Sequence, residues 1–139
     1  MPKDRDVPQP RLIRLAGPLT ILVSVTAVCL IRLAAVSILR PKEEFVPLMP
    51  GPPVLDTALA ASGAIVVFAR IWSDSLEPAR EYRSLAAKVL MVSFLPDMAL
   101  AVMHGFGAGW PEAIALMAMH IAVWAICVTM LPVLCWGHR

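Results

Sequence analysis

The sequence has few charged residues and none of the short motifs that mark a catalytic or metal-binding site. Its 12 Lys and Arg and 10 Asp and Glu leave a formal net charge of +2, which is too small to indicate a nucleic-acid partner. It contains no HExxH, paired-cysteine, GxSxG or glycine-rich phosphate-loop pattern. The three cysteines lie in apolar stretches, where small hydrophobic packing is their usual role. These absences predict no cofactor and no bound metal, and they count against an enzyme.

Apolar residues dominate what is present. They make up 59% of the 139 residues, with a mean hydropathy of +0.75, whereas apolar residues make up roughly 45–50% of a soluble domain. They are gathered into four stretches, at residues 15–39, 54–72, 84–104 and 113–136. Each stretch is close to the ~20 residues that a helix needs to cross a bilayer. We therefore predict an all-α fold, a four-helix transmembrane bundle that forms a single integral membrane domain over residues 1–139, surrounded by lipid.

The positions of Lys and Arg predict the orientation of this bundle. With four spans, most basic residues fall on one side, in the N-terminal tail, in the middle loop and at the last residue. The other side has only Arg40 and Lys42, both in the first loop. The positive-inside rule then predicts an N-in/C-in protein of the inner (plasma) membrane, with both termini cytoplasmic. The first span is longer than the apolar core of a signal peptide, so we expect it to remain uncleaved.

The two loops on the outer side differ in composition. The first, residues 40–53, is rich in proline, and each proline ring removes a backbone donor, so we expect an extended segment there. The second, residues 104–111, is rich in glycine and predicts a tight turn, with Trp110 at the membrane interface and Pro111 at the start of the fourth helix. Loops this short leave almost no room for a soluble domain.

A few polar residues lie inside the apolar stretches. Arg32, Asp97 and His120 each lie about 10 Å below the outer boundary, counted at ~1.5 Å per residue. A lone charge at that depth costs at least ~2.5–3.5 kcal/mol, so such groups are expected to turn inward and meet. We predict an Arg32–Asp97 ion pair, with His120 within reach of one partner. Residues of similar depth or on the same helical face complete the predicted polar network of Arg32, Ser62, Ser93, Asp97, His104 and His120.

Two interpretations of this network remain open, and the sequence favours the first. In the first it is a satisfied internal cluster that fixes helix register, as in an accessory or scaffold protein that packs as a homo-oligomer or with another membrane protein. In the second it lines a small cavity that binds a proton, an ion or a small polar ligand, as in a transporter, channel or sensor. An integral-membrane enzyme is a third class of function, for which the sequence identifies no catalytic residues.

Several short segments together resemble a known family. They are EFVPL at residues 44–48, VFAR at 67–70, PAREYR at 78–83, SFLPD at 93–97 and LMAMH at 116–120. Their order is similar to that in a family of small bacterial four-helix integral membrane proteins of unknown function. The resemblance covers most of the chain from Arg40 onward and implies a four-span bacterial membrane protein, without an established activity or catalytic residues. The glycine-rich turn after His104 is longer than expected for this family.

Overall fold

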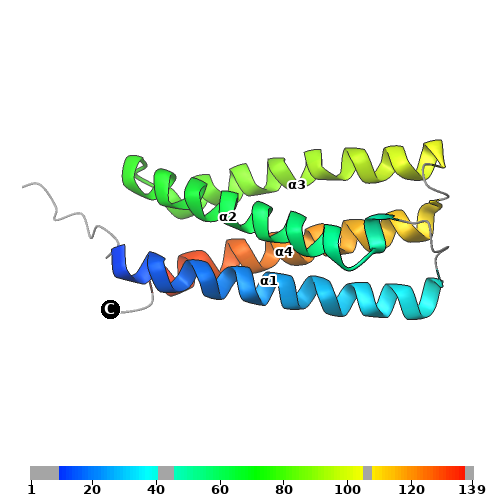
Figure 1. The fold of residues 1–139 in the computed structure, drawn as a ribbon. Helices are drawn as coiled ribbons and strands as arrows, with labels where there is room; N and C mark the ends of the chain where they lie inside the picture. The colour runs from blue at the N-terminus through cyan, green and yellow to red at the C-terminus, as the bar shows by residue number, and fades with distance from the viewer. Residues whose placement is uncertain (1–9, 41–45, 105–107, 137–139) are drawn as a thin grey trace, which may run out of the picture.

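The computed structural model describes residues 10–40, 46–104 and 108–136, with side chains from Arg14 to Cys135. In this part of the chain the elements are α1 (Pro10–Leu39), the short 3-10 helix η1 (Val46–Leu48), α2 (Gly51–Asp74), α3 (Pro78–Met103) and α4 (Trp110–Trp136). The four long helices run side by side, and the described residues contain no strand (Figure 1). The predicted all-helical fold with four long helices is confirmed.

All four helices are long and apolar enough to cross a membrane. The candidate spans are Arg14–Leu39, Gly51–Asp74, Pro78–Met103 and Trp110–Cys135, with mean hydropathies between 1.7 and 2.4. Large apolar side chains such as Leu15, Ile38 and Val66 point outward and are exposed. A continuous apolar surface of this kind is stable against acyl chains and unfavourable in water. The four predicted apolar helices are therefore confirmed in number and in approximate position.

All four helices begin before the apolar stretches that predicted them. α2 begins at Gly51 instead of residue 54 and has Pro52 and Pro53 in its first turn, while α3 begins at Pro78 instead of residue 84. Proline fits the first turn of a helix because the N–H groups there have no intrahelical partner to lose. Pro52 and Pro53, which were assigned to an extended loop, thus start a helix. Residues 41–45 of the predicted extended loop and 105–107 of the predicted glycine-rich turn lie outside the described residues.

The helix ends form two distinct ends of the bundle. The start of α1, the link between α2 and α3 and the end of α4 lie together at one end, which we call the α2–α3 end (Figure 1). The end of α1, η1 and the start of α4 lie together at the opposite end, which we call the η1 end. The start of α4 follows the prediction, because Trp110 and Pro111 open the helix. There the Gly109 N–H donates to Glu112 Oε2 at 2.9 Å, which satisfies a donor that the helix leaves free.

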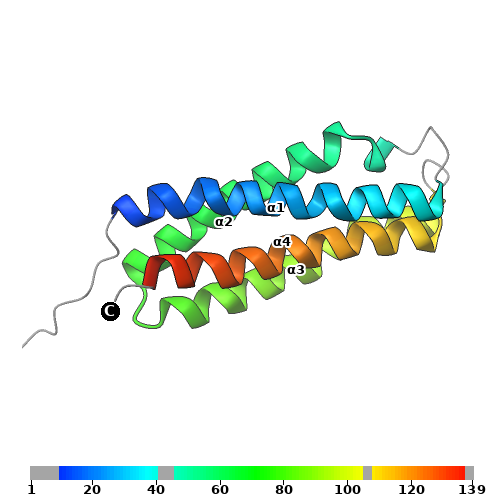
Figure 2. The same cartoon turned by 90° about the horizontal axis from the view of Figure 1, so that it is seen from below.

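Packing is closest around α4, which lies against both α1 and α3. α1 packs along α4 and α2, α3 packs along α4, and α2 also touches α4 across the short diagonal. Near the α2–α3 end, the Phe68 ring lies 5.0 Å from the Tyr82 ring in an edge-on arrangement and 5.2 Å from the Trp72 ring. Near the η1 end, Val28 and Leu48 are buried in a second cluster. α2 runs obliquely to the others and diverges from α3 toward the η1 end (Figure 2).

Candidate functional site

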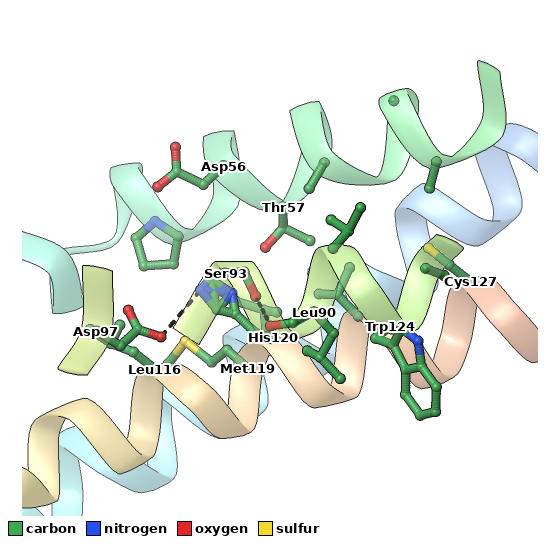
Figure 3. Close-up of a pocket in the computed structure, with 18 of the residues that line it drawn as sticks. Asp56, Thr57, Leu90, Ser93, Asp97, Leu116, Met119, His120, Trp124 and Cys127 are labelled. Carbon is green, nitrogen blue, oxygen red and sulfur yellow. Dashed lines mark hydrogen bonds and ion pairs between the residues drawn. The ribbon is translucent and has the colours of Figure 1, made fainter. Parts of the chain in front are cut away.

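A cavity of about 690 Å³ lies between α2, α3 and α4, in the space that the divergence of α2 from α3 leaves open (Figure 3). Val28 of α1 and Pro47 of η1 also contribute to its lining. Its volume falls within the roughly 300–1,000 Å³ that is usual for small-molecule sites. The cavity is thus large enough to hold an organic ligand between the long apolar helices.

Polar side chains gather at the end of the cavity nearer η1. They are Asp56 and Thr57 from α2, Ser93 and Asp97 from α3, and His120 from α4 (Figure 3). Each comes from the predominantly apolar part of its helix, and the polar groups of α3 and α4 meet where Asp97 contacts His120. This meeting explains how the helices accommodate residues that would be costly against lipid.

Asp97 is the most deeply buried of the acidic residues that the structure describes, with 5% of its surface exposed. Its Oδ2 lies 3.4 Å from His120 Nε2, which is within ion-pair distance. The contact does not have the geometry of a hydrogen bond, and Oδ2 has no hydrogen-bond partner among the described residues. A buried carboxylate oxygen without a donor is costly. This oxygen is shielded from solvent and faces the His120 imidazole, while the Asp97 side chain as a whole lines the cavity.

The rest of the cavity is mostly apolar. It continues from the polar end past Leu90 and Val123 toward Val67, Tyr82 and Cys127. Tyr82 is 2% exposed, and its hydroxyl has no hydrogen-bond partner among the described residues. No Lys or Arg is among the residues that line the cavity, as far as the chain is described. The site thus combines carboxylates at one end with an apolar body, and its lining has no basic residue besides His120.

The predicted Arg32–Asp97 ion pair is wrong. Arg32 Nε donates a hydrogen bond of 2.7 Å to the Leu48 carbonyl of η1, and no ion pair joins Arg32 to Asp97, both of which the structure describes. The reason is the arrangement of the helices, since α2 and α4 meet across the short diagonal and stand between α1 and α3. Equal depth in the membrane does not bring residues on opposite corners together. Arg32 instead links α1 to η1 through its hydrogen bond to the Leu48 carbonyl.

Two further members of the predicted network lie away from the cavity. Ser62 is exposed on α2, and its hydroxyl donates to the Ala58 carbonyl one turn earlier at 2.7 Å. His104 is exposed at the end of α3, where its backbone has a left-handed φ of 51° and its Nδ1 lies 3.3 Å from the Ala108 carbonyl oxygen. Both side chains satisfy their polar atoms locally and do not line the cavity.

The other predicted residues do come together. Ser93, Asp97 and His120 all line the cavity, and the expectation that His120 reaches a partner of the network is confirmed by its contact with Asp97. The Ser93 hydroxyl donates to the Leu90 carbonyl at 2.8 Å within α3. That bond leaves the oxygen lone pairs of Ser93 free to accept from a ligand in the cavity.

Asp56 and Thr57 were missed by reasoning from the sequence. They lie in the second turn of α2, close to residue 54, where the apolar stretch was predicted to begin. For that reason they were not counted among the polar residues inside the stretch. A signal was present, because Asp56 is the sole acidic residue of the stretch at residues 54–72. Asp56 belongs to the cavity wall but is exposed, and its carboxylate points away from Asp97 and His120 (Figure 3).

The described residues contain no group of three or more His, Cys, Asp or Glu side chains placed to hold a metal ion. Comparisons of the chain with protein-family models, with curated proteins and with solved structures find no match. The function is therefore argued from the cavity and its polar end.

Proposed function

We propose that this protein is a small multi-pass membrane transporter or sensor, whose cavity binds a proton or a cation at Asp97 and His120. The observation that carries the proposal is the Asp97 carboxylate, which is 5% exposed, faces the cavity and has an oxygen without a hydrogen-bond donor. Charge interactions are strong where water is excluded, so an unneutralised carboxylate attracts a positive charge. No Lys or Arg of the lining opposes this attraction.

A proton and a cation compete for this site. Protonation of Asp97 removes its negative charge, and protonation of His120 adds a positive charge 3.4 Å away. The titratable groups that line the cavity are Asp56, Tyr82, Asp97, His120 and Cys127. Of these, the imidazole is the type of side chain that commonly changes charge between pH 5 and 8. Cation binding therefore strengthens as the pH rises and releases protons from the site.

The proposal includes the orientation and the membrane. Arg14, Arg70, Arg80 and Arg83 lie toward the α2–α3 end, whereas Arg40 lies at the η1 end. By the positive-inside rule, the α2–α3 end and both termini face the cytoplasm of a bacterial cell, with the protein in its plasma membrane. The polar end of the cavity then lies toward the outer face. The family resemblance agrees with this assignment, which stays a prediction.

An accessory or scaffold protein is the second candidate function. The short link between α2 and α3 favours it, because residues 75–77 are all that separates these two helices. A protein with so little chain outside its helices would contact itself or another membrane protein through the helix faces. In that case Asp97 and His120 contribute to folding, and their substitution changes stability without changing any response to cations.

The test is thermal unfolding of the full chain in phosphatidylcholine nanodiscs between pH 5 and 8. Tetramethylammonium and sodium are compared at equal ionic strength. We expect tetramethylammonium to raise the unfolding temperature of the wild type, more so at high pH, because a ligand stabilises the state that binds it. Asp97→Asn should abolish this response.

Asp74→Asn is the matched control. Asp74 is exposed at the end of α2, where it pairs with Arg70, and its variant should keep the full response. His120→Gln provides a second variant in case Asp97→Asn does not fold, and it should retain cation binding while flattening the pH dependence. A tetramethylammonium response that survives in Asp97→Asn would contradict the proposal.

A further inference from the structure

We infer that the cavity takes a cationic amphiphile, an ammonium group with one unbranched apolar tail, which enters from the bilayer between α2 and α3. This inference rests on the proposed cation site and names the class of ligand that the site binds. The shape of the cavity, the side on which it opens and the charge of its lining each support it independently.

The shape of the cavity fits an elongated ligand with one polar end. Asp56 marks the polar end on α2, and Gly63 and Val67 line the cavity farther along the same helix. At ~1.5 Å per residue, Gly63 lies about 10 Å and Val67 about 16 Å from Asp56. Beyond the polar end the wall is mostly apolar. A head group at the carboxylates would therefore leave room for a tail that runs along α2 toward Val67.

The cavity opens sideways, between α2 and α3. The residues of its wall that are exposed belong to these two helices, among them Ala60 and Gly63 on α2 and Leu85 and Val89 on α3. The residues that α4 contributes to the wall are buried or half-buried. An opening in the side of a membrane-spanning bundle faces acyl chains. A ligand with an apolar tail is concentrated there, whereas a small hydrophilic ion is not.

The charge of the wall selects a head group that is cationic and has no anionic part. Asp97 offers a buried carboxylate and Asp56 an exposed one, and the wall has no Lys or Arg within the described residues. A zwitterionic phospholipid brings a phosphate, which would meet no cation in the cavity unless His120 is protonated. A fatty acid or an alkyl sulfate is repelled outright. A single-chain amine or quaternary ammonium satisfies the carboxylates and fills the apolar part.

Gly63 provides a way to shorten the cavity without touching its polar end. A Cβ atom added to Gly63 meets nothing within 4 Å, so a larger side chain there extends into open space. The leucine in Gly63→Leu would then occupy part of the path of the tail. Ser62→Leu is the matched control, because Ser62 is the neighbouring small residue, is exposed, and does not line the cavity.

The experiment is calorimetric titration of the full chain in phosphatidylcholine nanodiscs, with the heat of empty nanodiscs subtracted. The probes are tetramethylammonium, butyltrimethylammonium and octyltrimethylammonium, with octyl sulfate and octyl glucoside as probes of the same tail without the cation. We expect affinity to rise by up to about fourfold per added methylene, which corresponds to ~0.8 kcal/mol. Gly63→Leu should weaken the binding of octyltrimethylammonium on the order of tenfold, since the leucine side chain takes the place of about two methylenes of the tail. Tetramethylammonium binding should be unchanged in this variant, and Ser62→Leu should behave as the wild type.

The outcomes separate this inference from the proposed function. If tetramethylammonium binds in a way that depends on Asp97, but butyltrimethylammonium and octyltrimethylammonium bind no more tightly, the inference is overturned and the cation site stands. Equal binding of octyl sulfate or octyl glucoside would also overturn the inference, because the cavity would then be a general acyl-chain or lipid site. If Gly63→Leu changes the oligomeric state and leaves octyltrimethylammonium binding intact, the opening is a contact with a second copy, and the inference is wrong. Absence of any Asp97-dependent cation binding would refute both proposals.

Discussion

Removal of the Arg32 side chain tests how α1 is tied to the rest of the molecule. Arg32 Nε donates to the Leu48 carbonyl at 2.7 Å, and Leu48 is buried in the cluster near the η1 end. A hydrogen bond from a charged donor contributes roughly 1.5–3 kcal/mol. We therefore expect Arg32→Ala to lower the free energy of unfolding by about 2 kcal/mol. Equilibrium unfolding by dodecyl sulfate in mixed micelles measures this change.

A double-mutant cycle between Arg32 and Asp97 makes the prediction sharper. The two residues share no partner, so the effects of Arg32→Ala and Asp97→Asn should add to within ~0.5 kcal/mol. A buried ion pair would behave differently, because breaking it from either side leaves an unpaired charge and costs ~3–5 kcal/mol. A coupling energy of that size would refute the arrangement of α1 and α3 described above. A cycle between Arg32→Ala and the exposed Asp74→Asn provides the baseline.

Three further predictions concern the core, the orientation and a helix start. Phe68→Ala should lower the free energy of unfolding by ~3–5 kcal/mol because Phe68 is fully buried, whereas Val66→Ala on the exposed face should change it by less than ~0.5 kcal/mol, as dodecyl sulfate titration would measure. In a cysteine-free background, a membrane-impermeant maleimide should label Met49→Cys in intact cells and Leu76→Cys only in opened cells; the reverse pattern would invert the topology. Glu112→Ala should cost about 1 kcal/mol of stability, since the Gly109 N–H loses its acceptor, and an unchanged unfolding midpoint would count against this cap.

The fold could be predicted from the sequence because it depends on length and composition. Apolar stretches of about 20 residues are rare outside membranes, and they fixed the number of helices and their approximate limits. The start of α2 was placed too late because Pro52 and Pro53 were assigned to an extended loop, although proline is favourable in a first turn. The start of α3 was placed too late because Arg80, Glu81 and Arg83 precede its apolar stretch. The orientation relative to the membrane still rests on the positions of Lys and Arg.

The site could be predicted only in part, because residue counting gives depth and not direction. Asp97 and His120 have similar depths and do meet, whereas Arg32 has a similar depth and points to η1. The direction of a side chain depends on the rotation of its helix, which is set by packing. A helix that is apolar all round, as α4 is, carries little pattern that reveals its inner face. Ser62 was misplaced for the same reason.

The account depends most on the claim that a cation bound at the Asp97 carboxyl displaces a proton from Asp97 or His120 inside the cavity. Infrared difference spectroscopy of the full chain in phosphatidylcholine nanodiscs, with and without octyltrimethylammonium, observes the carboxyl group directly. At a pH where the site holds its proton, the account predicts that the cation changes a carboxyl or carboxylate band and that Asp97→Asn lacks this change while Asp74→Asn keeps it. A spectrum without a carboxyl change at any pH between 5 and 8, or one that persists in Asp97→Asn, would contradict the account.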